Sequence, residues 1–148
     1  MPNLSEALQM GERQNVEFKR GISPEDGKVS SVDEEILKSV VAFANTNDGV
    51  IFIGIDDFAQ VKGLGLDSKA KDRLEGRIRQ LVRTRIRPIP PIGIGFEDVR
   101  GLVVAKIVVA RGESPIYMLG GVVYVRDGSH DVAAQPEQLT RLVLEHAV

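Results

Sequence analysis

The chain has no cysteine, no tryptophan and only two histidines among its 148 residues. Without cysteine, the sequence excludes disulfide scaffolds, thiol nucleophiles and cysteine-ligated zinc or iron–sulfur sites. The two histidines, His130 and His146, have no metal-ligand partner at short spacing. No apolar run approaches the roughly 18 residues of a membrane helix, and the N-terminus lacks a basic-then-apolar signal pattern. We therefore expect a cytoplasmic protein with no membrane partner.

Neither sign of charge is in large excess, because 19 Lys and Arg residues stand against 21 Asp and Glu residues. The formal net charge is −2 and the isoelectric point is about 5.7. Any affinity for a polyanion must then come from a local basic patch, not from the protein as a whole. The hydrophobic content of 43% and the charged content of 27% are ordinary for a globular protein. We expect residues 1–148 to form one domain around one core.

The first half of the chain predicts helices that alternate with strands. Apolar residues recur at helical spacing after a capping box formed by Ser31 and Glu34, and Val16 and Phe18 alternate with charged residues as in a half-buried strand. The expected elements are a helix over 4–10, a strand over 16–19, an exposed loop over 21–30, a helix over 31–45, a turn over 47–49 and a strand covered on both faces over 50–55.

The second half predicts one long helix and then mostly strands. The Pro-Ile-Pro-Pro segment at 88–91 cannot remain helical, and Arg100-Gly101 provides a hairpin turn. The expected elements are a hairpin return over 61–66, a helix from Asp67 or Ser68 to Pro88, strands over 92–96 and 102–109, a hairpin of 115–118 with 122–126, and a helix over 136–146. The fold class is α+β: one mixed sheet, about three to four helices and a largely β second half.

Acidic side chains lie close to the ends of two predicted strands. Glu12 and Glu17 flank the start of the first strand, and Asp56 follows the apolar strand. A hard cation such as Mg²⁺ or Mn²⁺ takes oxygen ligands, so these three carboxylates are candidate metal ligands for phosphodiester hydrolysis. Lys19 would stabilise the charge that develops on the phosphoryl oxygens. The pattern alone also fits a surface ion pair between Glu17 and Lys19 on an exposed strand face.

Two glycines near the apolar strand have alternative interpretations. Gly49 ends a polar turn that either shapes a site or only caps the preceding helix, with the glycine supplying a positive φ. Gly54 interrupts an otherwise bulky strand, which predicts a bulge or a close backbone approach. That approach is either to a ligand or to a packed helix.

The predicted helix over 68–87 carries eight of the 19 basic residues. Basic residues four positions apart form stripes along a helix, and we interpret them as a phosphate-binding surface. The same charge run also fits a solvated helix face. The candidate nucleic-acid-binding residues are Lys69, Arg73, Arg77, Arg79, Arg83 and Arg87.

Three further side chains have a functional and a structural interpretation. Tyr117 and Tyr124 could stack on a base, but their strand-like surroundings favour core or sheet packing. His130 follows Gly128-Ser129 and is interpreted as a loop residue, not as a general acid.

Several blocks of the sequence together resemble a known domain family. The blocks are Glu17-Phe18-Lys19, the segment from Ala42 to Thr46, Gly49, the segment from Ile53 to Asp57, Val61-Lys62-Gly63, Pro115 and the segment from Tyr124 to Ser129. In this order they resemble the Schlafen-type, AlbA-like domain, which is described as a DNA-binding domain of prokaryotic regulators. One departure is Asp48, where the family commonly has the first glycine of a Gly-Gly pair.

The resemblance implies a nucleic-acid-binding function. In animal Schlafen proteins, acids at the positions matching Glu12, Glu17 and Asp56 form a metal-dependent endoribonuclease site for structured RNA such as transfer RNA. The sharper hypothesis is therefore Mg²⁺- or Mn²⁺-dependent RNA cleavage, and the alternative is a non-catalytic DNA- or RNA-binding module of a regulator. Those proteins contain two related lobes, so a homodimer is expected here. Nucleotide binding is a third possibility, although the chain has no Gly-x-x-x-x-Gly-Lys-Ser/Thr loop.

Overall fold

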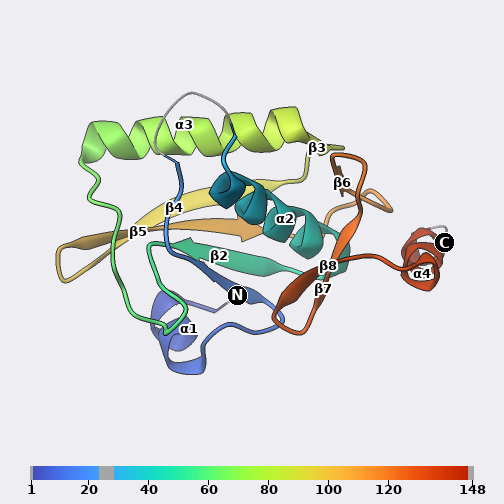
Figure 1. Ribbon diagram of the computed structural model, residues 1–148, viewed down its shortest axis with the longest axis horizontal. Coiled ribbons are helices and arrows are strands. Elements are labelled where there is room, and N and C mark those ends of the chain that lie inside the picture. The colour runs from blue at the N-terminus through green and yellow to red at the C-terminus, as the bar shows by residue number, and fades with distance from the viewer. Residues whose placement is uncertain (1, 24–28, 147–148) are drawn as a thin grey trace.

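A four-stranded mixed sheet forms the centre of the protein, with strand order β1-β2-β5-β4 (Figure 1). The computed structural model describes residues 2–23 and 29–146, so residues 24–28 of the predicted loop lie outside the described residues. β1 (Val16–Lys19) runs parallel to β2 (Gly49–Ile53), which pairs antiparallel with β5 (Leu102–Val109), and β5 pairs antiparallel with β4 (Ile92–Val99). The predicted α+β class with a mixed sheet is confirmed.

The central strand β2 is buried along its whole length because both faces of the sheet are covered. Ile51 and Ile53 point to one face and pack in the core cluster that holds the inner sides of α2 and α3. Val50 and Phe52 point to the other face, where they meet α1. This alternation is the two-residue period of a strand. The predicted two-sided burial is confirmed.

Two long helices cover one face of the sheet. α2 (Ser31–Thr46) begins at the predicted residue, but its capping box is formed by Ser30 and Asp33 and not by Ser31 and Glu34. α3 (Ser68–Arg85) is capped by Asp67, as predicted. Its inner face is buried, with apolar residues at helical spacing: Leu74, Ile78, Leu81, Val82 and the following Ile86.

The other face is covered by the short helix α1 (Leu4–Met10). The side chain of Asn3 accepts a hydrogen bond from the Glu6 N–H at the start of this helix, and Gly11 ends it with a φ of 78°. The prediction for this segment is confirmed at both ends. None of the described helices is both long and apolar enough to cross a bilayer.

The C-terminal strands differ from the predicted hairpin of 115–118 with 122–126. β6 (Met118–Leu119) pairs with β3 (Ile86–Arg87), and β7 (Tyr124–Asp127) pairs with β8 (His130–Ala133). The true hairpin turns at Gly128-Ser129, where Gly128 has a φ of 60°. His130 is therefore the first residue of a strand and not a loop residue.

The chain continues into α4 (Pro136–Glu145), which begins with proline as predicted. This helix lies at one end of the molecule, beyond the β7–β8 hairpin (Figure 1). The hairpin return predicted over 61–66 is instead an irregular loop, with one isolated bridge between Ile55 and Val61. β4 extends to Val99, three residues further than predicted.

The two glycines near β2 have structural roles that differ from the expected ones. Gly49 does not have a positive φ; a side chain there would lie 2.2 Å from Cδ1 of Phe43. Gly54 has a φ of 112°, and its carbonyl accepts hydrogen bonds from the N–H groups of Lys62 and Gly63. The close approach predicted at Gly54 is thus to the 61–66 loop, and not to a helix.

We expect Gly49→Ala to destabilise the protein by about 1–3 kcal/mol, because the added methyl group overlaps the ring of Phe43 in a packed core. Gly76→Ala is the matched control. Gly76 lies within α3 with open space around it, and alanine there should stabilise the helix by about 0.5–1 kcal/mol. Urea unfolding of both variants measures the two changes; effects of the same sign would contradict this account.

Candidate functional site

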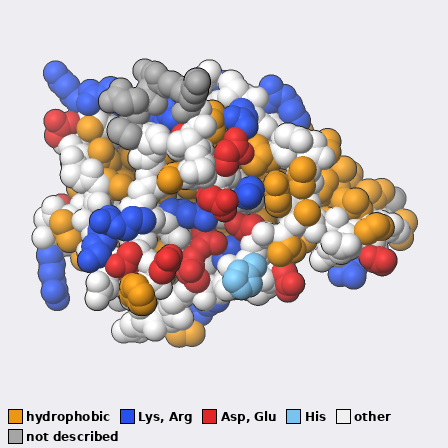
Figure 2. Space-filling model, viewed as in Figure 1, with side chains coloured by type: hydrophobic (Ala, Val, Ile, Leu, Met, Phe, Trp, Pro, Cys, Tyr) orange, Lys and Arg blue, Asp and Glu red, His pale blue; other side chains and the backbone are white. Residues whose placement is uncertain are grey.

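An open cleft of about 830 Å³ lies beside β1. We call it the acidic cleft, because five carboxylates line it together with two cations and a histidine. Figure 2 shows Asp and Glu side chains gathered near the middle of this face, with Lys and Arg side chains at their border. The charged and titratable lining residues are Glu12, Glu17, Lys19, Arg20, Glu35, Asp57, His130 and Asp131.

The guanidinium of Arg126 lies behind the cleft and is completely buried. Its Nη1 donates to Oε1 of Glu17 and to Oδ1 of Asp131, each at 2.8 Å. Its Nη2 donates to the carbonyls of Arg13 and Val16, each at 2.9 Å. The guanidinium also lies 4.9 Å from the ring centroid of Phe43. One side chain of β7 therefore links β1, β8 and the turn before β1.

Glu17 is consequently a buried, paired carboxylate and not a member of an exposed strand face. Its exposed fraction is 7%, and its salt-bridge partner is Arg126 and not Lys19. The surface-pair interpretation is wrong because the face of β1 that carries Glu17 is covered by the β7–β8 hairpin. With Asp131 beside it, the buried group carries two negative charges against one positive charge.

Glu12 has a backbone partner at the outer edge of the sheet. Its Oε2 accepts a hydrogen bond of 3.0 Å from the N–H of Phe18, which points away from β2 because β1 is an edge strand. On the same edge, the carbonyl of Val16 is bonded by Arg126. Glu12 thus stabilises β1 with one oxygen while its side chain lines the cleft.

Lys19 projects from the end of β1 into the same cleft. Burial lowers its pKa from the ordinary value of 10.5, and the nearby carboxylates of Asp131, Glu35 and Glu12 partly oppose that shift. A lowered pKa means that the ammonium is held against a desolvation cost, which disappears as the pH rises toward 10.5. A lysine kept in a cleft at such a cost is a candidate for contact with a ligand.

Asp56 does not line the cleft that Glu12 and Glu17 line. Its Oδ1 accepts hydrogen bonds of 2.9 Å from the N–H groups of Phe58 and Gln60. The Gln60 N–H is the main cause of the lowered pKa of Asp56, and the Phe58 N–H and Lys62 add to it. Asp56 therefore shapes its own loop, and Asp57 is the acid of this pair that faces the cleft.

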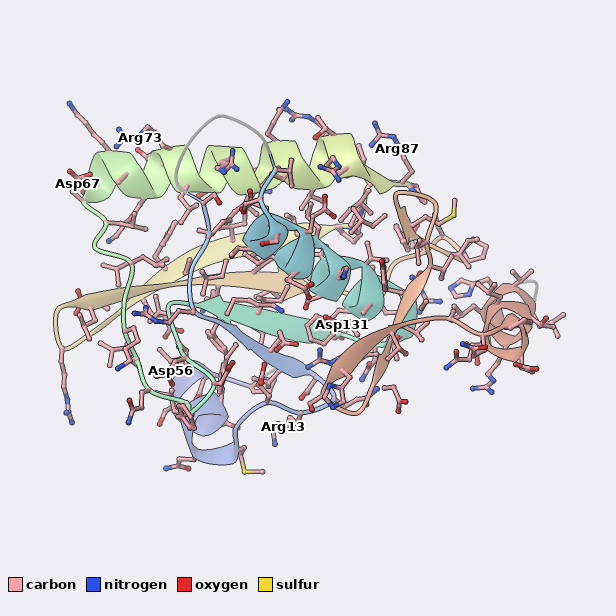
Figure 3. All side chains as sticks on the ribbon, in the orientation of Figure 1. Arg13, Asp56, Asp67, Arg73, Arg87 and Asp131 are labelled. Atoms are coloured by element: carbon pink, nitrogen blue, oxygen red, sulfur yellow. The ribbon has the colours of Figure 1, made fainter. Side chains whose placement is uncertain are left out.

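The three carboxylates predicted as metal ligands do not form one ligand set. Over residues 2–23 and 29–146, no group of three or more His, Asp or Glu side chains is arranged to hold a metal ion. Figure 3 shows Asp56 on the loop after β2, well to the side of Asp131. Glu12, Glu17 and Lys19 do share the cleft, but one oxygen each of Glu12 and Glu17 is already occupied.

The basic residues of α3 divide into exposed and structural ones. Arg77 is structural: its Nη2 contacts Oδ2 of Asp33 at 2.8 Å, its Nε donates to the carbonyl of Ser23, and the exposed fractions of the Arg77 and Asp33 side chains are 8% and 0%. This position faces α2, so Arg77 is removed from the predicted phosphate-binding set. The remaining five predicted residues are exposed: Lys69, Arg73, Arg79, Arg83 and Arg87.

We call these five residues the basic stripe. Figure 3 shows Arg73 and Arg87 projecting away from the sheet near opposite ends of α3. Arg79 forms an exposed ion pair with Glu75, and the Arg83 side chain donates to Gln80 within the same helix. Such exposed contacts contribute little to stability and are readily exchanged for a phosphate.

Two residues that matter for this region were not predicted as functional. Arg126 and Asp131 organise the back of the cleft, but their partners are far away in the sequence. The available signal was an arginine within the apolar strand pattern of 122–126, since a charge in a buried strand needs a partner. Tyr117 is buried in the core, as predicted, and the Asn45 side chain bonds its backbone N–H and carbonyl.

Comparisons with known proteins give a family and a fold. The family described as "Schlafen, AlbA_2" matches residues 12–135, well over half of the chain. One similar solved structure is the DIP2311 protein from Corynebacterium diphtheriae, with a TM-score of 0.63 and 22% identity over 87% of this chain. This chain spans only 23% of that protein.

A second similar structure is the N-terminal domain of a RecG-related protein from Nitrosomonas europaea, a name that refers to an ATP-dependent DNA helicase. The TM-score is 0.55 and the identity 22%, over 89% of this chain and 90% of that domain. At this identity the two structures show a shared fold. No curated protein matches the chain significantly.

Removing the Arg126 side chain should cost about 3–5 kcal/mol of unfolding free energy, because Glu17 and Asp131 would lose the buried partner that they share. Arg126→Ala and the exposed α4 variant Arg141→Ala form the comparison, and the second should change stability by less than about 0.5 kcal/mol. Chemical denaturation measures both. Equal effects would show that Arg126 does not hold these elements together.

Proposed function

This chain belongs to the Schlafen, AlbA_2 family, and from that premise we propose that it is a nucleic-acid-binding domain, with RNA favoured and DNA as the alternative ligand. The single observation that supports this most is the basic stripe on α3. Four exposed cations lie along α3 and a fifth, Arg87, lies in β3 directly after it, in a chain whose formal net charge is −2.

The basic stripe is the surface on which we expect phosphates to bind, because its charges are positive while the cleft carries mostly carboxylates. Arg and Lys side chains gain affinity for nucleic acids by neutralising phosphates and releasing counterions. Arginine also binds phosphate oxygens through two parallel N–H groups. The five carboxylates of the acidic cleft would repel a phosphate backbone, so the backbone is expected along α3 and not among those carboxylates.

Arg73→Ala and Arg83→Ala should each weaken binding of a structured RNA. Each should also lower the slope of log K against log salt by about 0.7–0.9 for every phosphate that the variant no longer neutralises. Fluorescence anisotropy at several salt concentrations measures both quantities. Arg141→Ala, which removes an exposed arginine from α4, is the matched control and should leave the slope unchanged.

Arg77→Ala is not a suitable variant for this experiment, because it breaks the buried pair with Asp33 and would weaken binding through unfolding. Unchanged titrations for Arg73→Ala and Arg83→Ala would remove α3 from the interface.

A homodimer is a further part of the proposal, since a two-fold pair would present two stripes. Light scattering of the protein alone and with RNA measures the number of chains.

Metal-dependent cleavage of structured RNA such as transfer RNA is the finer form of the proposal. It is supported by the presence of Glu12, Glu17 and Lys19 in one cleft. The described carboxylates do not fit a three-ligand Mg²⁺ or Mn²⁺ site, because Asp56 binds its own loop and Glu17 is paired with Arg126. The proposed binding function therefore does not depend on the proposed catalytic one.

Catalysis in this cleft predicts Mn²⁺-dependent cleavage of transfer RNA that Glu12→Gln abolishes while RNA affinity is retained. Asp56→Asn should preserve cleavage, because Asp56 does not line the cleft. Gel analysis of the RNA products beside anisotropy titrations separates the two functions. If the wild type shows no cleavage with Mg²⁺ or Mn²⁺, the chain is a binding module only.

A further inference from the structure

Phe58 is the most exposed of the large hydrophobic residues in the described part of the chain, with an exposed fraction of 85%. It lies on the loop that follows β2 and contributes nothing to either core cluster. Its neighbours Asp57 and Gln60 are polar and exposed, so the ring is not part of an apolar surface along the loop. Because the ring stays in water, it contributes almost no burial free energy to the fold.

The loop that presents Phe58 is held by several hydrogen bonds. The Asp56 carboxylate accepts from two backbone N–H groups, those of Phe58 and Gln60, both at 2.9 Å. The Asp56 N–H donates to the Gln60 carbonyl at 3.0 Å, and the Ala59 N–H donates to the Asp56 carbonyl at 3.1 Å. These bonds fix the backbone under the ring, so the loop presents the ring without first having to be ordered.

Backbone strain at Ala59 also supports a binding role for this loop. Ala59 has a φ of 60°, a conformation that costs a residue with a side chain about 1–3 kcal/mol and persists only where the surroundings impose it. Ala59 also packs against the core cluster beneath β2, which anchors the loop. A strained, anchored loop that displays an aromatic ring to solvent is typical of a binding position.

The charges around the loop indicate which kind of ligand fits. The Lys62 Nζ lies 3.9 Å from Oδ2 of Asp56, and the charge of Arg20 also acts on Asp56. Arg20 and Asp57 both line the acidic cleft, and Phe58 directly follows Asp57 in the chain.

We propose that Phe58 is a stacking platform for one unpaired nucleobase of a bound nucleic acid, with Arg20 and Lys62 contacting the flanking phosphates. The inference rests on the proposed nucleic-acid-binding function and adds a preference for unpaired segments. A nucleobase has a neutral, flat face that stacks on phenylalanine, and the cations beside the ring match the backbone on either side. Duplex nucleic acid has its bases stacked inside and offers no face to the ring.

The test compares a fluorescently labelled single-stranded RNA with a duplex of the same sequence. Phe58→Leu should lower the affinity for the single strand roughly 5- to 100-fold, the range for removing one base–aromatic stacking interaction. The salt dependence should stay as in the wild type, because no charge is removed, and the affinity for the duplex should not change. Leu144→Ala is the matched control: it removes a side chain that is 62% exposed on α4, and it should alter neither affinity.

Phe58→Trp provides a direct readout, since the chain contains no other tryptophan. Its fluorescence should be quenched when single-stranded RNA is added and unchanged by the duplex, and its affinity for the strand should match or exceed that of the wild type. Thermal unfolding of all variants should coincide, because the side chain at position 58 lies in solvent.

The outcomes separate the two proposals. If the wild type binds neither RNA, the proposed function fails. If the wild type binds RNA through the basic stripe but Phe58→Leu binds single strand and duplex as well as the wild type does, only the stacking platform is overturned. Equal losses for both RNAs also overturn it. A change in the oligomeric mass of Phe58→Leu with unchanged RNA affinity assigns the ring to a protein contact and overturns it as well.

Discussion

The hydrogen bonds and ion pairs of the Arg126 guanidinium hold together the elements around the acidic cleft. It binds two carboxylates and three backbone carbonyls from three separate segments while it is fully buried beside Phe43. Arginine suits this position because its five N–H donors lie in one rigid plane, whereas a lysine ammonium could not reach all these acceptors at once. These bonds hold the β7–β8 hairpin against β1, and residues of both β1 and β8 line the cleft.

This constraint limits what the acids of the cleft can do. Glu17 and Asp131 are held in place by charge and hydrogen bonds, and Glu12 has a backbone donor at the sheet edge. The side chains proposed for contact with a nucleic acid lie outside this hydrogen-bonded group: the basic stripe and Phe58 on the loop after β2. Lys19 lines the cleft, where burial lowers its pKa.

The sequence predicted most of what depends on local pattern. The capping residue Asp67 predicted the start of α3, and Gly54 predicted a close backbone approach. The sequence could not separate Arg77 from Arg73, because the two arginines are four residues apart on one helix and only the contact with Asp33 of α2 distinguishes them. Glu17 and Arg126 are 109 residues apart, so their pairing has no local signature. β8 was missed because it has only one large apolar residue, Val132.

The edge of the sheet at β1 shows how the fold limits its own association. Unpaired N–H and C=O groups of an edge strand are a template for a strand from another molecule. Here the Phe18 N–H is bonded by Glu12 and the Val16 carbonyl by Arg126, so neither of these two groups is available to a strand from another molecule. Because Arg126 is made after most of the chain, a nascent polypeptide on the ribosome leaves this edge only partly closed until β7 emerges and folds onto it.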